Sequence, residues 1–145
     1  MDWTLEVIVL PVADIERSIA FYRDQLGFAL DHDTQTPQMR VVQLTPRGSG
    51  CSIVLGMSQM QPGSMKGLQL VVSDAEAARA ELLSRGVEVS ELFHDRTGIF
   101  RHSGTDGRVP GPADARADYG SFASFTDPDG NGWLLQEIKT RLPGR

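Results

Sequence analysis

The feature that most constrains the fold is a weak internal duplication at an offset of 60 residues. The corresponding pairs are Val12 with Val72, Asp14 with Asp74, Glu16 with Glu76, and Ala20 with Ala80. Gly27 and Gly86 also correspond, one residue out of step. Because a repeated order of elements indicates a repeated supersecondary unit, the chain is predicted to fold as two copies of one module.

The first copy is predicted to have the order β-α-β-β-β. Residues 5–12 are mostly apolar and β-branched, which is typical of a buried strand. Asp14 is a predicted helix N-cap, apolar residues then recur at helical spacing, and Gly27 ends the helix. Three short apolar segments separated by turn residues predict the remaining strands, at residues 28–30, 40–44 and 51–55.

The second copy has the same order after a connector rich in Gly and Met. A strand is predicted at residues 68–72, followed by a helix with Ser73 and Glu76 as its capping box and Gly86 as its stop. Three further strands are predicted at residues 87–93, 121–125 and 133–138. We therefore predict one α+β domain over residues 1–145, with two βαβββ modules whose mixed sheets curve around a shared cleft. Its parts are a first module at about 5–56, a connector at about 57–66 and a second module at about 67–140.

Composition excludes several classes of function. The chain of 145 residues carries 14 basic and 19 acidic side chains, a net charge of -5, and it has no basic cluster to attract nucleic acid or an anionic membrane. Cys51 is the single cysteine, so neither an intrachain disulfide nor a cysteine-based zinc site can form. Apolar runs are too short to span a membrane, and the first residues lack the pattern of a secretion signal. A cytoplasmic protein with a small-molecule ligand is predicted.

Two segments carry a family resemblance: VADIERSIAFYRDQLGF, at residues 12–28, and FTDPDGNGWLLQEI, at residues 125–138. They resemble the first-module and last-module signatures of the vicinal oxygen chelate superfamily. That superfamily includes glyoxalase I, extradiol dioxygenases, fosfomycin-inactivating transferases and bleomycin-binding resistance proteins. The resemblance covers nearly the whole chain except residues 94–120, and it implies a homodimer. The DPDG sequence by itself predicts only a tight turn between two strands.

The resemblance also implies where metal ligands would lie in metal-dependent members, namely His or Glu side chains on the first and last strand of each module. The corresponding positions in this chain are apolar: Val7, Leu68 or Gly67, Val54 or Leu55, and Leu134. Glu6 and Glu137 lie close by but an odd number of residues away, so strand alternation predicts that they point away from the cleft into solvent. We therefore predict no metal and no other cofactor.

Acid–base chemistry, if present, is expected from histidines in residues 94–120. This segment is long for a hairpin connection and contains five Gly, two Pro, four Arg and four Asp. His94 and His102 are the candidate catalytic residues, because a histidine can act as a general base near neutral pH. The alternative interpretation is a polar loop without chemistry. His32, between Asp31 and Asp33, is predicted to be a solvated loop residue.

A cleft without a metal must bind its ligand by buried area, ring stacking and a few polar contacts. The candidate ligand-binding residues are aromatic side chains near the turn and the long segment, an arginine that can clamp an anion, and amides in otherwise apolar strands. They are Phe100, Tyr119, Trp133, Phe125, Arg101, Gln43, Gln69 and Gln136.

Three hypotheses about function result. The first is a metal-free binding protein similar to the bleomycin-resistance branch, which holds a hydrophobic or aromatic molecule without converting it. The second is a metal-free isomerase or lyase that uses His102 or His94 as acid and base. The third is a metal-dependent, glyoxalase-like or dioxygenase-like enzyme, which requires the strand register to be shifted so that Glu6 and Glu137 become ligands.

Overall fold

The computed structural model describes residues 1–99 and 105–145. Its contacts divide the chain into two compact units. The first comprises residues 1–65 and 127–131, and the second comprises residues 66–126 and 132–145. The boundary between them therefore falls in the predicted connector, which contains neither helix nor strand. The turn at residues 127–131, although it comes late in the chain, belongs to the first unit.

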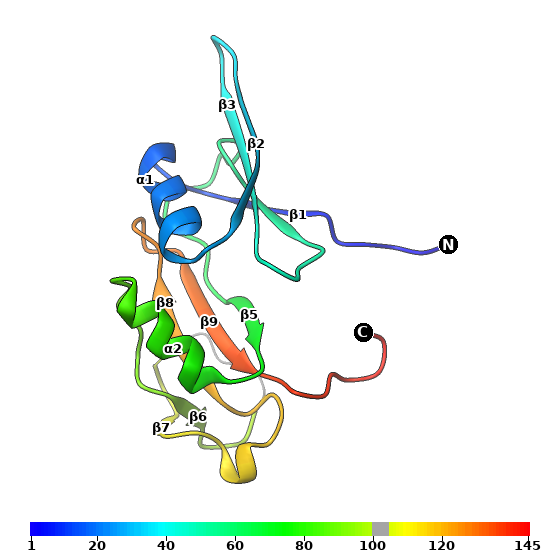
Figure 1. The fold of residues 1–145 in the computed structure, drawn as a ribbon, viewed down its shortest axis with the longest axis vertical. Helices are drawn as coiled ribbons and strands as arrows, with labels where there is room; N and C mark the ends of the chain where they lie inside the picture. Colours follow the sequence, from blue (N-terminus) through cyan, green and yellow to red (C-terminus); the bar gives the residue numbers. More distant parts are fainter. Residues whose placement is uncertain (100–104) are drawn as a thin grey trace. The chain divides into compact units, whose positions relative to one another are not determined.

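The first unit contains a mixed sheet of four strands in the order β1-β4-β3-β2 (Figure 1). β1 (Val7–Leu10) runs parallel to β4 (Ser52–Leu55), and the other neighbours are antiparallel. β2 (Ala29–Gln35) and β3 (Arg40–Thr45) form a hairpin. β2 is longer than predicted and includes His32, so the prediction of a loop there is wrong, although this histidine is exposed.

The helical segment of the first unit begins and ends where the sequence predicts. The Asp14 carboxylate accepts a hydrogen bond from the Arg17 N–H at 3.1 Å and caps α1 (Ile15–Ile19). The helix continues as a π-helix, η1 (Ala20–Gln25), and ends before Gly27, which has a positive φ of 77°. Its buried side chains, including the fully buried Tyr22, complete an apolar core with the strand residues Leu10, Val42, Leu44 and Leu55.

The turn at residues 127–131 is a buried polar cluster within the first unit. Asp127 accepts hydrogen bonds from the Tyr22 hydroxyl at 2.7 Å and from the Asn131 side-chain amide at 2.8 Å. The same Asn131 amide donates to the Pro11 carbonyl at 2.8 Å, and Arg17 pairs with Asp129 at 2.9 Å. The DPDG motif is thus more than a turn, because its carboxylates bond to the helical segment and the neighbouring Asn131 amide bonds to the residue after the first strand.

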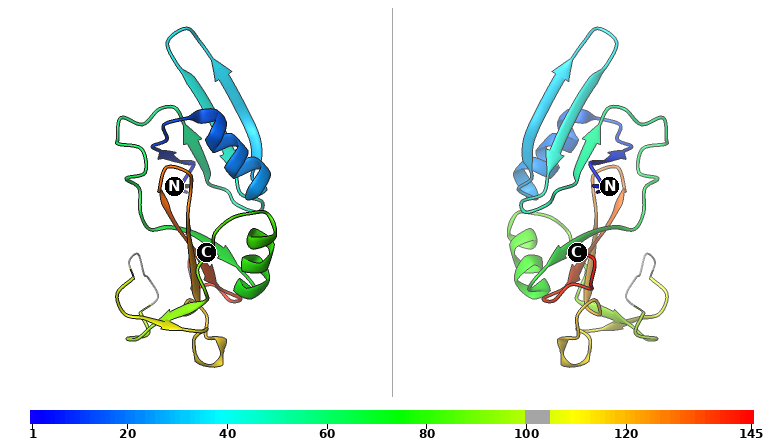
Figure 2. Two further views of the ribbon diagram at one scale, coloured as in Figure 1. Left: turned by 90° about the vertical axis from the view of Figure 1, so that its left-hand side faces the viewer. Right: turned by 90° about the vertical axis from the view of Figure 1, so that its right-hand side faces the viewer.

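The second unit contains a mixed sheet of five strands in the order β5-β9-β8-β6-β7 (Figure 1). β5 (Leu68–Val72) and β9 (Gly132–Glu137) are parallel, and β9 pairs antiparallel with β8 (Phe122–Thr126). β6 (Phe93–Asp95) and β7 (Arg108–Pro110) form a short antiparallel pair at the far edge. Figure 2 shows these elements from two further sides.

The helix of the second unit, α2 (Ala75–Ser84), is capped by Asp74, whose carboxylate accepts from the Ala77 N–H at 3.0 Å. The prediction that Ser73 is the cap is therefore wrong by one residue. Asp74 is the duplicate of Asp14, so the two helices begin in the same way. Gly86 ends the helix with a φ of 81°, as the sequence predicts.

Two predictions about strands in this unit are wrong. The strand predicted at residues 87–93 begins only at Phe93 and continues to Asp95. The predicted long loop at 94–120 contains β7 and a short 3-10 helix, η2 (Asp114–Arg116). The α+β class and the mixed sheets are confirmed. Among the helices of the described ranges, none is long and apolar enough to cross a membrane.

Candidate functional site

The register of the second sheet sorts its residues onto two faces. Residues opposite one another on neighbouring strands point to the same side. Gln69 lies opposite Leu134, Val71 opposite Gln136, and Phe122 opposite both Gln136 and Phe93. We call the side that carries these six residues the distal face. The other side is the helix face, where the Glu137 carboxylate accepts a hydrogen bond from the Ala75 N–H of α2 at 2.9 Å.

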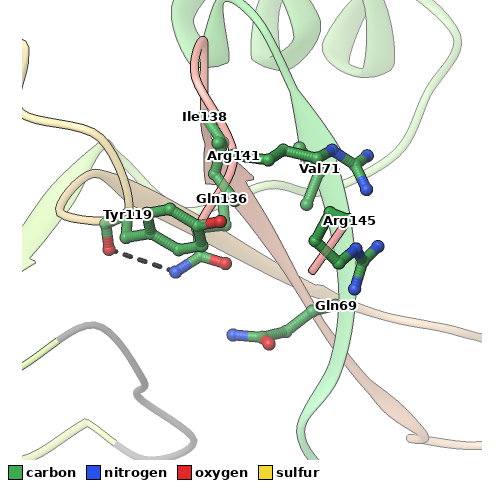
Figure 3. A pocket seen from close by; sticks show the side chains of 7 residues that line it. All are labelled: Gln69, Val71, Tyr119, Gln136, Ile138, Arg141 and Arg145. Carbon is green, nitrogen blue, oxygen red and sulfur yellow. Dashed lines mark hydrogen bonds between the residues drawn. The ribbon is translucent and has the colours of Figure 1, made fainter. Parts of the chain in front are cut away.

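A hollow of about 260 Å³ lies on the distal face beside the C-terminal segment (Figure 3). We call it the tail hollow. Its walls combine two aliphatic side chains, a tyrosine, two amides and two arginines: Val71, Ile138, Tyr119, Gln69, Gln136, Arg141 and Arg145. It therefore brings together Gln69, Tyr119 and Gln136, three of the predicted ligand-binding residues.

Hydrogen bonds tie the C-terminal segment to residues 118 and 119 at the rim of this hollow. The Asp118 carboxylate accepts from the backbone N–H of Lys139 at 2.6 Å and from that of Thr140 at 3.2 Å. The Tyr119 hydroxyl accepts from the Leu142 N–H at 2.8 Å. Arg141, between these anchored residues, thus projects from a backbone that is held on both sides.

Tyr119 adopts a backbone conformation that L-residues rarely occupy, with φ at 69°. Such a residue persists only where its surroundings hold it in place, and here they do. The Tyr119 N–H donates to the Glu137 carbonyl at 3.0 Å, and the Tyr119 carbonyl accepts from the Gln136 side-chain amide at 3.1 Å. The tyrosine ring is consequently positioned by contacts at both ends of the residue.

The two glutamines of the tail hollow differ in how their amide nitrogens are used. In Figure 3 they extend from neighbouring strands toward Tyr119, and the Gln136 amide nitrogen donates its hydrogen bond to the Tyr119 carbonyl. The Gln69 amide nitrogen is buried and makes no hydrogen bond with any described residue. A buried donor without a partner costs roughly 1–3 kcal/mol, so a ligand acceptor here would recover this free energy.

Glu137, on the helix face beneath this region, is 1% exposed. The prediction that it faces solvent is therefore wrong, although strand alternation correctly places it on the other side of the sheet from Leu134 and Gln136. Its carboxylate pairs with the Arg116 guanidinium at 2.5 Å. Hydrogen bonding from Arg116 lowers the pKa of the Glu137 carboxyl below its ordinary value, and the Ala75 N–H adds to this effect.

A second hollow, of about 450 Å³, contains His94 in its wall and shares Tyr119 with the first. We call it the histidine hollow. His94 Nδ1 lies 2.8 Å from the Gly111 carbonyl oxygen. Since a carbonyl oxygen can only accept, Nδ1 must carry the hydrogen, and Nε2 of the neutral ring is then a proton acceptor. Asp95, Asp114 and Asp118 also line this hollow.

An aromatic cluster occupies the centre of the distal face. The rings of Phe93 and Phe122 stack with centroids 5.5 Å apart, and Leu134 packs with them. The Arg108 guanidinium lies 3.9 Å from the centroid of the Phe93 ring, a cation–π arrangement, and donates to the Ser124 hydroxyl at 3.0 Å. Burial lowers the pKa of Arg108.

The other predicted ligand-binding residues lie elsewhere. Phe125 and Trp133 stack on each other with centroids 6.3 Å apart on the helix face, where both are buried, and they line neither hollow. Gln43 belongs to the first unit, where its amide donates to the Ser52 hydroxyl at 3.2 Å. Phe100, Arg101 and His102 lie outside the described residues, so their predicted roles stay predictions.

A family model decides the classification of the chain. The model of the Glyoxalase/Bleomycin resistance protein/Dioxygenase superfamily matches residues 4–135. The chain belongs to this superfamily. The resemblance in its two signature segments is thereby confirmed. No curated protein matches the chain.

Solved structures of the superfamily agree with the family model. TnmS3, an antibiotic binding protein from Streptomyces sp. CB03234, is 30% identical with a TM-score of 0.71, over 95% of this chain and 98% of its own. A glyoxalase/bleomycin resistance protein from the same organism is 31% identical with a TM-score of 0.67, over 92% of this chain and 100% of its own. A superfamily member from Sphaerobacter thermophilus DSM 20745 is 26% identical with a TM-score of 0.69, over 94% and 98% of the two chains.

The structure revises one of the positions that superfamily resemblance assigned to metal ligands. Of the two alternatives for this position, Leu68 or Gly67, Leu68 lies opposite Trp133 on the helix face, so it does not point to the same side as Leu134. Gln69 takes that place, and an amide is a weak metal ligand beside carboxylate or imidazole. In the first unit, Val7 and Val54 do share one face of their sheet. Among the described residues, no group of three His, Cys, Asp or Glu side chains could hold a metal ion.

Sequence reasoning missed Arg141 and Arg145 and the Arg116–Glu137 pair. The two arginines come after the last superfamily signature segment, where no periodic pattern singles out a residue. Two arginines within the last five residues of an acidic chain were the available signal. The sequence contains no signal of the ion pair, because its partners are 21 positions apart and Arg116 comes from an irregular segment.

Proposed function

We propose that this protein binds a small organic molecule with a hydrophobic or aromatic body, without a metal ion and without converting it. The tail hollow is the proposed site for one end of that molecule, and the buried aromatic cluster of Phe93, Phe122 and Leu134 is the apolar core beneath the neighbouring part of the same face. Both lie on one face of one sheet, and both belong to the second unit.

The observation that carries the proposal is the position of Leu134 on the last strand. In metal-dependent relatives, the resemblance implies a metal ligand at this position of the last strand. Here a leucine packs against two stacked phenylalanine rings and is 4% exposed. A hydrocarbon side chain at this position offers no donor atom to a metal ion, and it makes the middle of the distal face apolar, which favours a ligand with a hydrocarbon body.

The similarity to an antibiotic binding protein supports a small-molecule ligand. A superfamily fold alone does not determine chemistry, so the proposal depends chiefly on the residues of the distal face. Because the family resemblance implies it, we also propose that the protein is a homodimer. Analytical ultracentrifugation would test this, and a monomer at micromolar concentration would contradict it.

The proposal is tested with purified protein that has been dialysed against EDTA. A panel of polycyclic aromatic compounds is titrated by calorimetry, and each bound compound is then released and analysed by mass spectrometry. We expect stoichiometric binding of at least one compound and its recovery unchanged. Loss of binding after EDTA treatment, restored by a divalent metal ion, or release of a converted product would contradict the proposal.

A second function is favoured by the hydrogen bond from His94 to the Gly111 carbonyl. This bond leaves Nε2 as a proton acceptor in the wall of the histidine hollow, as an acid–base isomerase or lyase requires. A His94→Gln variant separates the two functions. If the protein only binds its ligand, binding should persist in this variant. An EDTA-resistant conversion that is lost in the variant would establish the isomerase or lyase function.

A further inference from the structure

We propose that the group bound in the tail hollow is an anion, namely the carboxylate of an aromatic acid, held by Arg141, Arg145 and the amide of Gln69. This inference rests on the proposed binding function and specifies its ligand. A neutral aromatic body would use only the apolar part of these walls. The arginines and the amide are polar groups that such a body leaves unused.

Charge is the first reason. The tail hollow has two guanidinium groups in its wall and no carboxylate side chain, whereas the whole chain carries a net charge of -5. Neither Arg141 nor Arg145 forms an ion pair with a described residue. Arginine stays charged at any physiological pH, and its planar fork of donors matches the two oxygens of a carboxylate.

The buried amide is the second reason. The Gln69 amide nitrogen is enclosed and without a hydrogen-bond partner among the described residues, and it belongs to the wall of the same hollow. An amide N–H₂ group can only donate, so it requires an acceptor. A carboxylate oxygen is a strong acceptor for such a group.

The third reason is that the position of Arg141 in the wall is prepared by hydrogen bonds of the backbone beside it. The backbone on either side of Arg141 is fixed by Asp118 and by the Tyr119 hydroxyl. Tyr119 itself is held in an unfavourable conformation by bonds to β9. A site prepared in this way loses less conformational entropy when a ligand binds.

Volume limits the size of the acid. A cavity of about 150 Å³ is sufficient for a benzene molecule. The tail hollow of about 260 Å³ therefore has room for one or two fused rings with a carboxylate, flanked by Val71, Ile138 and the Tyr119 ring. A larger ligand would place only its acidic end here and extend its body along the distal face.

The test compares 2-naphthoate with its neutral counterpart, 2-naphthamide, by titration calorimetry on the full chain. The acid should bind at least about tenfold more tightly than the amide. Added salt should weaken the binding of the acid and leave the binding of the amide unchanged. In an Arg141→Gln, Arg145→Gln double variant, the affinity for the acid should fall to that for the amide. Gln69→Leu should weaken acid binding by about fivefold or more, because a donor is lost.

Arg47→Gln is the control for a general effect of charge, since it removes one positive charge from an exposed position in the first unit and should leave both affinities unchanged. Circular dichroism verifies that each variant is folded. Equal affinities for acid and amide, or an acid preference that survives in the double variant, would overturn this inference but leave the proposed function intact. Failure of every compound of the aromatic panel to bind would contradict the proposed function and this inference together.

Discussion

The two modules share an order of elements, but they differ in the segments that connect their later strands. In the first unit, β2, β3 and β4 are joined by short connections and the sheet has four strands. In the second unit, residues 96–121 separate β6 from β8 and supply β7, η2 and the Tyr119 region. Both described hollows are lined only by residues of the second unit.

This difference shows where a duplicated fold gains its specificity. The matching parts, two capped helices and two mixed sheets, form the framework in both units. The unmatched segment and the C-terminal residues supply Tyr119, Arg141 and Arg145, the parts of the tail hollow without a counterpart in the first unit. The first unit instead buries its polar groups in the cluster around Asp127.

The largest effect on stability is expected from Asp127→Ala in the first unit. The variant removes the acceptor of the buried Tyr22 hydroxyl and one of the two acceptors of the Asn131 amide. We expect a loss of roughly 3–5 kcal/mol in the free energy of unfolding, measured in urea. Asp24→Ala, which removes an exposed carboxylate, is the control and should change little. A small effect of Asp127→Ala would show that this cluster is not part of the framework.

Glu137→Gln tests the corresponding buried polar group of the second unit. The free energy of unfolding should fall by about 2–4 kcal/mol, because the charge of Arg116 loses its buried partner but keeps some contact with water. Glu81→Gln, in an exposed pair with Arg85, should cost no more than about 0.5 kcal/mol.

The same variant should change how stability depends on pH. Since the folded protein lowers the pKa of Glu137 below its ordinary 4.5, the stabilisation is complete above that pH and is lost as pH falls through the folded value. The difference between wild type and variant should therefore shrink below about pH 4.5. A difference that stayed constant down to about pH 3 would contradict the assigned ion pair.

Gly63→Ala probes how closely the connector approaches the turn at residues 127–131. A Cβ at Gly63 would lie 2.1 Å from the Asp129 carbonyl oxygen, and the residue has a φ of 82°. We expect the free energy of unfolding to fall by about 2–3 kcal/mol, because of backbone strain at residue 63 and displacement of the Asp129 carbonyl. Gly48→Ala has a similar φ of 81° with no atom within 4 Å, so it should cost only about 1 kcal/mol. Equal losses would show that the contact is unimportant.

The smallest effect is expected on the aromatic cluster. Arg108→Gln removes the cation above the Phe93 ring and should destabilise the second unit by about 0.5–2 kcal/mol. Arg96→Gln removes a charge from the wall of the histidine hollow, and its effect on the free energy of unfolding is compared with that of Arg108→Gln. A neutral or stabilising Arg108→Gln would indicate that the cation is kept for a ligand and not for stability.

Much of the framework could be predicted from the sequence because short-range rules determine it. Helix capping by Asp14, the glycine stops and the order of the modules result from local chemistry and from the duplication. The duplication also pointed to Asp74 as the second cap, and the capping-box pattern at Ser73 competed with it. Strand alternation correctly separated Leu134 and Glu137 onto opposite faces of the sheet.

The failures arise where side chains or distant segments replace regular pairing. Val87 and Val89 are buried as the alternating pattern predicts, yet this segment is not a strand. At its end the Ser90 hydroxyl accepts the Ser124 N–H at 2.9 Å, in place of a backbone carbonyl. The burial of Glu137 depends on Arg116, and the tail hollow depends on Asp118, so neither could be read from a local pattern.

The most direct test of the proposed binding site is a map of ligand-induced amide chemical-shift changes, recorded by NMR during titration with 2-naphthoate. We predict that the shifted residues lie in the second unit and centre on Gln69, Tyr119, Gln136 and Ile138. Shifts centred on the strands of the first unit, around Gln43 and Val54, would contradict the assignment of the binding site to the second unit.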